Sequence, residues 1–366
     1  MNNSLDEKLL ETKTQRFEGF DFLRAIFSMA IVADHAELFF LATIMGMPAL
    51  TGILYANFSY IAVPVFFQIS LFLFYIKSKQ IGIKYFIQKR LSKLILLYLF
   101  WVTSLTILKV LFRGQVEVNN SEILSARKIF EFIVSGGNSP LYFFFSLIFT
   151  TTLAQALVFL FKNIKKSSLK TKINYSLLSS SCFLIFSFSI LGSTSSEVAV
   201  IHTISNIAKW NYNPLNFLPY IFTTAITAQE MDEGKFEQLA SFPKLKLYSL
   251  LFLFTAFILF EWNFSNNLNY TRLSLVFGSW LLLYVALLST RKPPAIIKLI
   301  SQCSLGIYAF HLFFTNVFFS GDQNVLTPLS HLVPGLSIIA EFLLVLIMSI
   351  SLTLVFRKTK GLRNFV

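Results

Sequence analysis

The chain has 366 residues, of which 55% are hydrophobic, only 13% are charged and 43 are phenylalanine. A mean hydropathy of +0.66 is more than a water-soluble protein of this length needs for its core, which excludes an ordinary globular domain and indicates a membrane protein. The formal charge of +13 also fits a nucleic-acid-binding protein, so the positions of the basic residues have to decide between these classes.

Apolar stretches long enough to cross a hydrocarbon core of about 30 Å as helix recur along the whole chain. They are too uniformly apolar for the alternating pattern of a membrane barrel. The sequence therefore predicts an all-α, polytopic integral membrane protein with ten transmembrane helices, near residues 17–41, 57–76, 94–112, 140–161, 176–192, 214–229, 247–263, 271–289, 301–320 and 332–356.

The basic residues gather on one side of these predicted spans. With a cytoplasmic N-terminus, 24 of the 31 lysines and arginines fall in inside segments. The positive-inside rule then predicts both termini in the cytoplasm, with the basic charge facing anionic lipid head groups and an anionic substrate rather than nucleic acid. We expect a cytoplasmic segment at 1–16, a transmembrane domain at 17–356 and a basic cytoplasmic tail at 357–366.

The first predicted span contains an arginine and a histidine, which are costly at membrane depth and therefore mark candidate functional residues. Arg24 and His35 are eleven positions apart, so they share one helix face at a distance of about 16 Å. The alternative is structural: Arg24 extends to the cytoplasmic head groups and His35 forms one interhelical hydrogen bond. Neighbouring acids favour the functional interpretation, since Asp21 can hold the guanidinium and either Asp34 or Glu37 can orient the imidazole.

Two further groups of polar residues accompany the predicted spans. Arg90 and Lys93 share a face just before the third span, where they form either a phosphate clamp or an ordinary positive-inside cluster. Tyr308 and His311 share a face in the ninth span, where they border a cavity or serve in helix packing. The loops at 113–139 and 193–213 face outside and are candidates to border an acceptor site. Cys182 and Cys303 both fall within spans and no cluster has metal-ligand spacing, so neither a disulfide nor a metal site is expected.

Several short motifs match a known family in order along the chain. Phe20–Arg24 with the Arg-x10-His spacing to His35 resembles the signature first helix of the acyltransferase-3 family of membrane O-acyltransferases. Phe66–Leu73 is similar to the family's F-F-x-I-S-G-F-L run, which contains Ser70. Lys89–Lys93 followed by Tyr98–Trp101 resembles its R-R-x-x-R element with a following proline and tyrosine.

The resemblance continues to the last fifth of the chain. Leu141–Phe144 corresponds to an aromatic element of the family, and Ser304–His311 resembles S-x-G-I-Y-x-x-H. A lysine at 93 keeps the charge of the usual arginine but loses its bidentate geometry. The departures from the family pattern are Leu71 for glycine, Lys93 for arginine, Leu96 for proline and Tyr142 for tryptophan.

The resemblance implies transfer of an acyl group, most often acetyl, from cytoplasmic acyl-CoA to a hydroxyl of a surface glycan or its lipid-linked precursor, with no permanently bound cofactor. Arg24, Arg90 and Lys93 would hold the CoA phosphates. His35 would act as general base, or would itself carry the acyl group, with Asp34 or Glu37 as its orienting partner. The acceptor or the developing oxyanion would contact Ser70, Tyr142, Tyr308 and His311.

A transporter or flippase of a glycan is the competing class, because such a protein uses buried charges as a translocation path without chemistry. No internal repeat and no helix pair broken by proline or glycine is evident, which favours the enzyme. In either class we expect a multi-pass protein of a bacterial cytoplasmic membrane, with the lipid bilayer and proteins of glycan biosynthesis or export as its partners.

Overall fold

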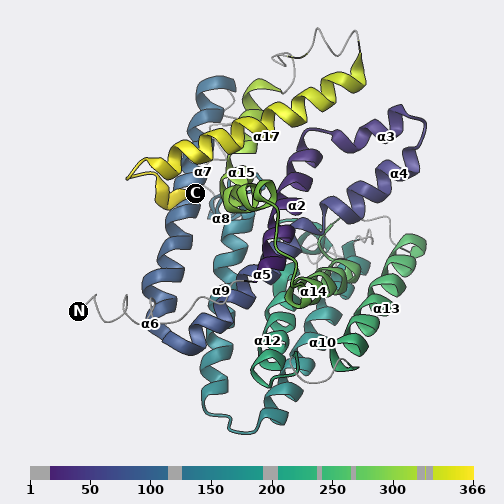
Figure 1. Ribbon diagram of the computed structural model, residues 1–366, viewed down its shortest axis with the longest axis vertical. Coiled ribbons are helices and arrows are strands. Elements are labelled where there is room, and N and C mark those ends of the chain that lie inside the picture. Colours follow the sequence, from purple (N-terminus) through teal and green to yellow (C-terminus); the bar gives the residue numbers. More distant parts are fainter. Residues whose placement is uncertain are drawn as a thin grey trace.

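The computed structural model describes residues 17–113, 126–192, 205–236, 241–264, 269–319, 326 and 333–366, and all regular structure in these ranges is helical. One long helix overlaps each of the ten predicted segments. Figure 1 shows these helices as one bundle, with α2 and α5 near its centre and α13 and α17 at its edges. The ten are α2 (Glu18–His35), α5 (Ala62–Ile81), α7 (Ser92–Arg113), α9 (Tyr142–Lys162), α10 (Ser167–Gly192), α12 (Leu218–Asp232), α13 (Ser241–Phe264), α14 (Leu273–Leu288), α15 (Ala295–Phe318) and α17 (Pro334–Lys358).

Seven helical segments of the described chain are long and apolar enough to cross a membrane, and a bent pair of helices makes an eighth candidate. α14 is apolar but has only 16 residues, and α12 has 15 with a proline in its first turn. The protein is therefore a multi-pass helical membrane protein. Ten crossings and cytoplasmic termini stay predictions.

Three helix boundaries differ from those expected. The first span was expected to reach 41, but α2 ends at His35 because Glu37 takes a left-handed conformation (φ 55°), and the chain bends by 73° into Leu38–Ile44. α5 continues a helical segment that begins at Pro48 and includes a π-helical turn at Leu54–Ser59. α10 begins at Ser167 rather than near 176, which places Lys170 on a helix instead of in a loop.

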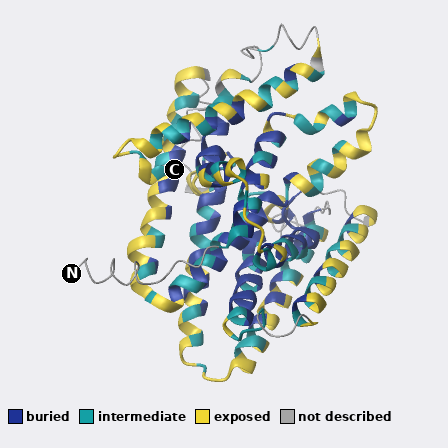
Figure 2. Cartoon of the chain, in the orientation of Figure 1, coloured by how far each residue is buried: buried dark blue, intermediate teal, exposed yellow. Residues whose placement is uncertain are grey.

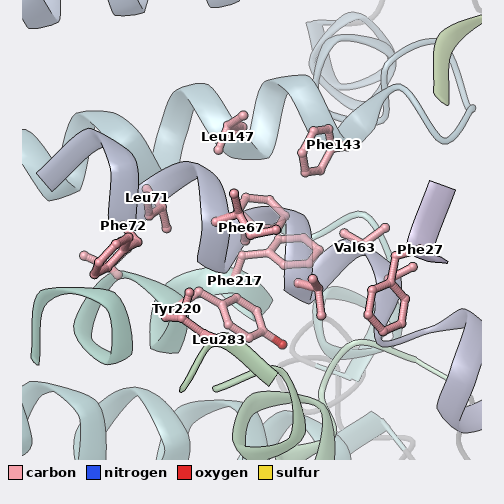
Figure 3. Packing of buried hydrophobic residues seen from close by; sticks show 14 of the residues in the cluster. Phe27, Val63, Phe67, Leu71, Phe72, Phe143, Leu147, Phe217, Tyr220 and Leu283 are labelled. Carbon is pink, nitrogen blue, oxygen red and sulfur yellow. The ribbon is translucent and has the colours of Figure 1, made fainter. Parts of the chain in front are cut away.

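The buried residues lie at the centre of the bundle (Figure 2), and many of them are aromatic. Phe67 of α5 stacks on Phe217 with ring centroids 4.5 Å apart and meets Phe143 of α9 at 5.0 Å (Figure 3). α2 packs closely against α14 at Gly19. A Cβ atom at this position would collide with the Ala286 carbonyl, so the close approach requires glycine. Large apolar side chains on the outer faces are exposed, as expected where the solvent is lipid.

A buried polar cluster fixes the start of α14. Arg272 lies 2.9 Å from the Glu261 carboxylate of α13 and donates to Asn57 of the π-helical turn at 2.7 Å. The Glu261 carboxylate also accepts the backbone N–H of Ser274 at 2.9 Å. Arg272, at the start of the predicted span 271–289, is buried, with only 7% of its surface exposed. The cluster therefore holds the segment before α14, including Tyr270, against the segment before α5.

Candidate functional site

The first cavity, which we call the basic cavity, has a volume of about 250 Å³ and lies between α2, α5, α7, α9 and α15. Arg24 reaches it from α2, Arg90 and Lys93 from the junction of the π-helical turn Phe86–Leu91 with α7, and Ser70 from α5. The sequence spacing paired Arg90 with Lys93. Tertiary packing adds Arg24, so three cationic side chains line one cavity whose other walls are largely apolar.

The cations of the basic cavity keep donors for a ligand. Arg90 donates from Nη2 to the Ser70 hydroxyl, while its buried Nε has no hydrogen-bond partner among the described residues. Asp21 accepts a hydrogen bond of 2.7 Å from Ser301 and lies near enough to Arg24 to attract its guanidinium. Arginine forks beside a lysine are the usual partners of phosphate oxygens, so this cavity suits an anionic, phosphate-bearing ligand.

The second cavity, which we call the tyrosine cavity, has a volume of about 220 Å³ and is lined by Asp34 and His35 at the end of α2. Aromatic faces combined with a carboxylate and an imidazole suit a polar ligand with an apolar face, such as a sugar ring. The six tyrosines that line it are Tyr55, Tyr60, Tyr142, Tyr212, Tyr270 and Tyr308.

His35 is exposed to the tyrosine cavity, and its nearest ring neighbour is another histidine. The rings of His35 and His311 have centroids 4.9 Å apart. His311 Nδ1 lies 3.1 Å from the Ile307 carbonyl oxygen, which can only accept, so Nδ1 carries the hydrogen and Nε2 has the lone pair. That buried Nε2 has no partner in the described part of the chain, so it is available to accept a hydrogen bond.

The acids that flank His35 have other surroundings than expected. Asp34 lines the same cavity and accepts a hydrogen bond from Ser59, but its Oδ1 has no partner among the described residues and no hydrogen bond joins it to His35. Glu37 lies beyond the end of α2, is exposed, and does not line the cavity. In the described part of the chain, the group that lies against the His35 imidazole is the His311 ring, and no hydrogen bond joins the two rings.

Tyr308 separates the two cavities, because it is the residue that lines both. Its hydroxyl donates to the Pro140 carbonyl, and its ring meets Phe143 edge-on at 5.3 Å. The hydrogen of this hydroxyl is thus engaged, while its oxygen can still accept a hydrogen bond from a ligand. Ser70, also expected on the acceptor side, instead lies in the basic cavity with Arg90. Tyr142 lies in the tyrosine cavity, with its ring 4.8 Å from that of Tyr212.

Sequence reasoning did not identify most of the tyrosine cavity. Its walls come from segments near 55–60, 211–212 and 269–270, which are far apart in the chain. The sequence does contain one weak signal for this cavity: the dipeptide Asn-Tyr occurs shortly before a helix both at 211–212 and at 269–270. In the structure the two dipeptides are in contact, since Asn211 Oδ1 accepts the Tyr270 backbone N–H at 3.3 Å. The outside loop at 193–213 was expected to border an acceptor site, and its end does line this cavity. Residues 193–204 and 114–125 lie outside the described ranges.

Fold and site together define a class: a multi-pass helical membrane protein in which one tyrosine separates a basic cavity from a histidine-bearing cavity. A family model described as an acyltransferase domain matches residues 17–358. The chain therefore belongs to the acyltransferase-3 family and is a membrane acyltransferase, which confirms the resemblance seen in its motifs. Neither a curated protein nor a solved structure matches the chain.

Proposed function

We propose that this acyltransferase moves an acetyl group from cytoplasmic acetyl-CoA to a hydroxyl of a cell-surface polysaccharide or of its lipid-linked precursor, in a bacterial cytoplasmic membrane. The observation that carries the proposal is the arrangement of the two cavities, which share Tyr308 as a wall. The donor, which has a charged end, can enter one cavity and the polar acceptor the other. The two substrates then meet at this residue.

The basic cavity would hold the donor. Arg24, Arg90 and Lys93 would bind the CoA phosphates, at the end of the bundle that the positive-inside rule assigns to the cytoplasm. Eleven residues of α2 separate Arg24 from His35 by about 16 Å, a distance of the order of the pantetheine arm. The apolar walls between them, which include Phe143 and Leu147, suit that uncharged arm.

The tyrosine cavity would hold the acceptor sugar, with His35 as general base. His35 would take the proton of the attacking hydroxyl while the hydroxyl oxygen forms a bond to the thioester carbonyl carbon. The carbon–sulfur bond then breaks, and the imidazolium returns the proton to the CoA thiolate. A hydrogen bond from the other ring nitrogen of His35 to His311 Nε2 would fix the tautomer.

Experiments can distinguish this mechanism from two alternatives. In the first, a nitrogen of His35 attacks the thioester and carries the acetyl group to the acceptor in a second step. In the second, the chain transports or flips a glycan and performs no acyl transfer. Family membership favours the enzyme. So does the exposure of His35 to a cavity that adjoins the basic cavity with its three cationic side chains.

Membranes that contain the protein, supplied with acetyl-CoA radiolabelled in the acetyl group, test the proposal. We expect label to enter the glycan fraction and to be released by mild base, as an O-acetyl ester is. Membranes without the protein are the control. If label does not move while deletion of the gene stops glycan export, the transporter is correct and the proposal is wrong.

Tyr308 provides a prediction on coupling between the two cavities. Tyr308→Ala would join them, so water would reach the thioester and hydrolysis of acetyl-CoA without acceptor would rise by roughly tenfold relative to transfer. Tyr308→Phe loses only the hydrogen bond to Pro140 and keeps the wall, so we expect coupling close to that of the wild type. The measurement is free CoA released per acetyl group transferred. Equal ratios for both variants would show that Tyr308 is not the barrier.

A further inference from the structure

A third cavity lies apart from the two that we assign to acyl transfer. It has a volume of about 600 Å³, lies between α5, α9, α10 and α12, and shares no lining residue with the basic or the tyrosine cavity. α10 follows α9 directly in the chain but packs mainly on α12, which leaves this space between α9 and α10. Figure 1 shows the turn that joins the two helices at the lower end of the bundle.

The cavity has a basic mouth. Lys79 at the end of α5, Lys162 at the end of α9 and Lys170 in the first turn of α10 line it. Lys79 pairs with Asp232, whereas Lys162 and Lys170 form no ion pair with a described residue. Two lysines that are not neutralised therefore stand at one opening, on the side to which the positive-inside rule assigns the cytoplasm.

Its interior combines apolar walls with polar groups that lack partners. Val158 and Phe159 of α9 and Ala225 and Ala228 of α12 form apolar parts of its lining. Tyr75 and Asn174 also line it and are only 3% and 1% exposed, yet the Tyr75 hydroxyl and Asn174 Oδ1 have no hydrogen-bond partner among the described residues. Buried polar groups are normally paired, so unpaired ones beside a cavity point to a missing ligand.

We propose that this cavity is a binding site for an anionic phospholipid of the cytoplasmic leaflet. The head-group phosphate lies at Lys162 and Lys170, and the glycerol oxygens and first methylenes of the chains lie deeper, near Asn174 and against Phe159 and Ala228. The apolar walls, set between two helices that qualify as membrane spans, argue for a lipid rather than a soluble phosphate. Lysines next to a leaflet attract anionic lipids in this way.

Native mass spectrometry of the full-length protein in detergent, with phosphatidylglycerol added, tests the proposal. Lys162→Gln/Lys170→Gln should weaken phosphatidylglycerol binding by roughly 30-fold, because each lysine contributes about one kcal/mol and 1.4 kcal/mol is a factor of ten. Lys165→Gln/Lys166→Gln is the matched control, since it removes the same charge from the connection between α9 and α10, at exposed positions that do not line the cavity. This control should bind as the wild type does.

Other outcomes overturn the proposal. Equal losses in the two double variants would mean general attraction to a basic surface, and equal binding of phosphatidylcholine, which is zwitterionic, would mean that the net negative charge of the head group is not recognised. Displacement of the lipid by millimolar glycerol phosphate would identify a soluble-phosphate site instead. Ala228→Leu, which changes no charge, should also weaken lipid binding, because the larger side chain fills the apolar part of the cavity. The melting temperatures of all variants show whether they fold. The readout is lipid binding, so its failure is independent of acyl transfer.

Discussion

Replacement of His35 by alanine is expected to lower acetyl transfer by a factor of about 10² to 10⁴, the usual contribution of a general base. The imidazole is exposed to the tyrosine cavity, where its neutral form can take the proton of a hydroxyl bound there. Initial rates of label transfer at saturating acetyl-CoA measure the effect. Transfer at the wild-type rate in His35→Ala would refute the assignment.

Four variants separate the contribution of His35 from that of its neighbours. Glu37→Gln is the matched control, because Glu37 follows His35 closely but does not line the cavity, and we expect it to leave the rate unchanged. His311→Ala should lower the rate and shift its pH profile, because it removes the acceptor that we propose for the second ring nitrogen of His35, whereas His311→Gln should restore part of the rate. Asp34→Asn should weaken acceptor binding more than turnover, because Asp34 lines the cavity without a hydrogen bond to His35.

The same assay distinguishes the two chemical roles of His35. If His35 carries the acetyl group, incubation with labelled donor and no acceptor places label on the wild-type protein, in a linkage that hydroxylamine cleaves. If it acts as a base, the protein stays unlabelled under these conditions while transfer remains dependent on His35.

Replacement of Arg90 by alanine is expected to raise the acetyl-CoA concentration for half-maximal rate by roughly 10- to 100-fold, since a hydrogen bond to a charged group contributes about 1.5–3 kcal/mol. The turnover number should change much less, because Arg90 lies in the basic cavity and His35 in the other. Truncation also releases the Ser70 hydroxyl from its bond to the guanidinium. An unchanged half-saturation concentration would show that the basic cavity is not the donor site.

Two variants of the same turn test whether charge or shape matters at Arg90. Arg90→Lys keeps the charge but loses the guanidinium fork, so we expect an intermediate effect. Lys89→Ala removes a neighbouring charge that does not line the cavity, and should leave donor binding near the wild-type value. Equal effects of Lys89→Ala and Arg90→Ala would mean that the donor senses only the basic surface.

Much of this protein could be predicted from its sequence. Hydropathy alone predicts the all-helical membrane architecture, because a chain in lipid has to satisfy its backbone hydrogen bonds within each helix. Helix periodicity places Arg24 and His35 on one face of α2, and local spacing places Arg90 beside Lys93, since contacts at three or four residues are set by helix geometry. The ordered motifs predicted the acyltransferase-3 family, which the match over residues 17–358 confirms.

Only the tertiary structure decided how these parts are grouped. It separates Arg24 from His35 into two cavities, places Ser70 beside Arg90, brings the His311 ring against that of His35, and makes Tyr308 the wall between the cavities. It also brings Tyr60, Tyr212 and Tyr270 together around His35. These contacts join residues on different helices, and single-sequence periodicity specifies which face a residue occupies but not which other helix that face meets.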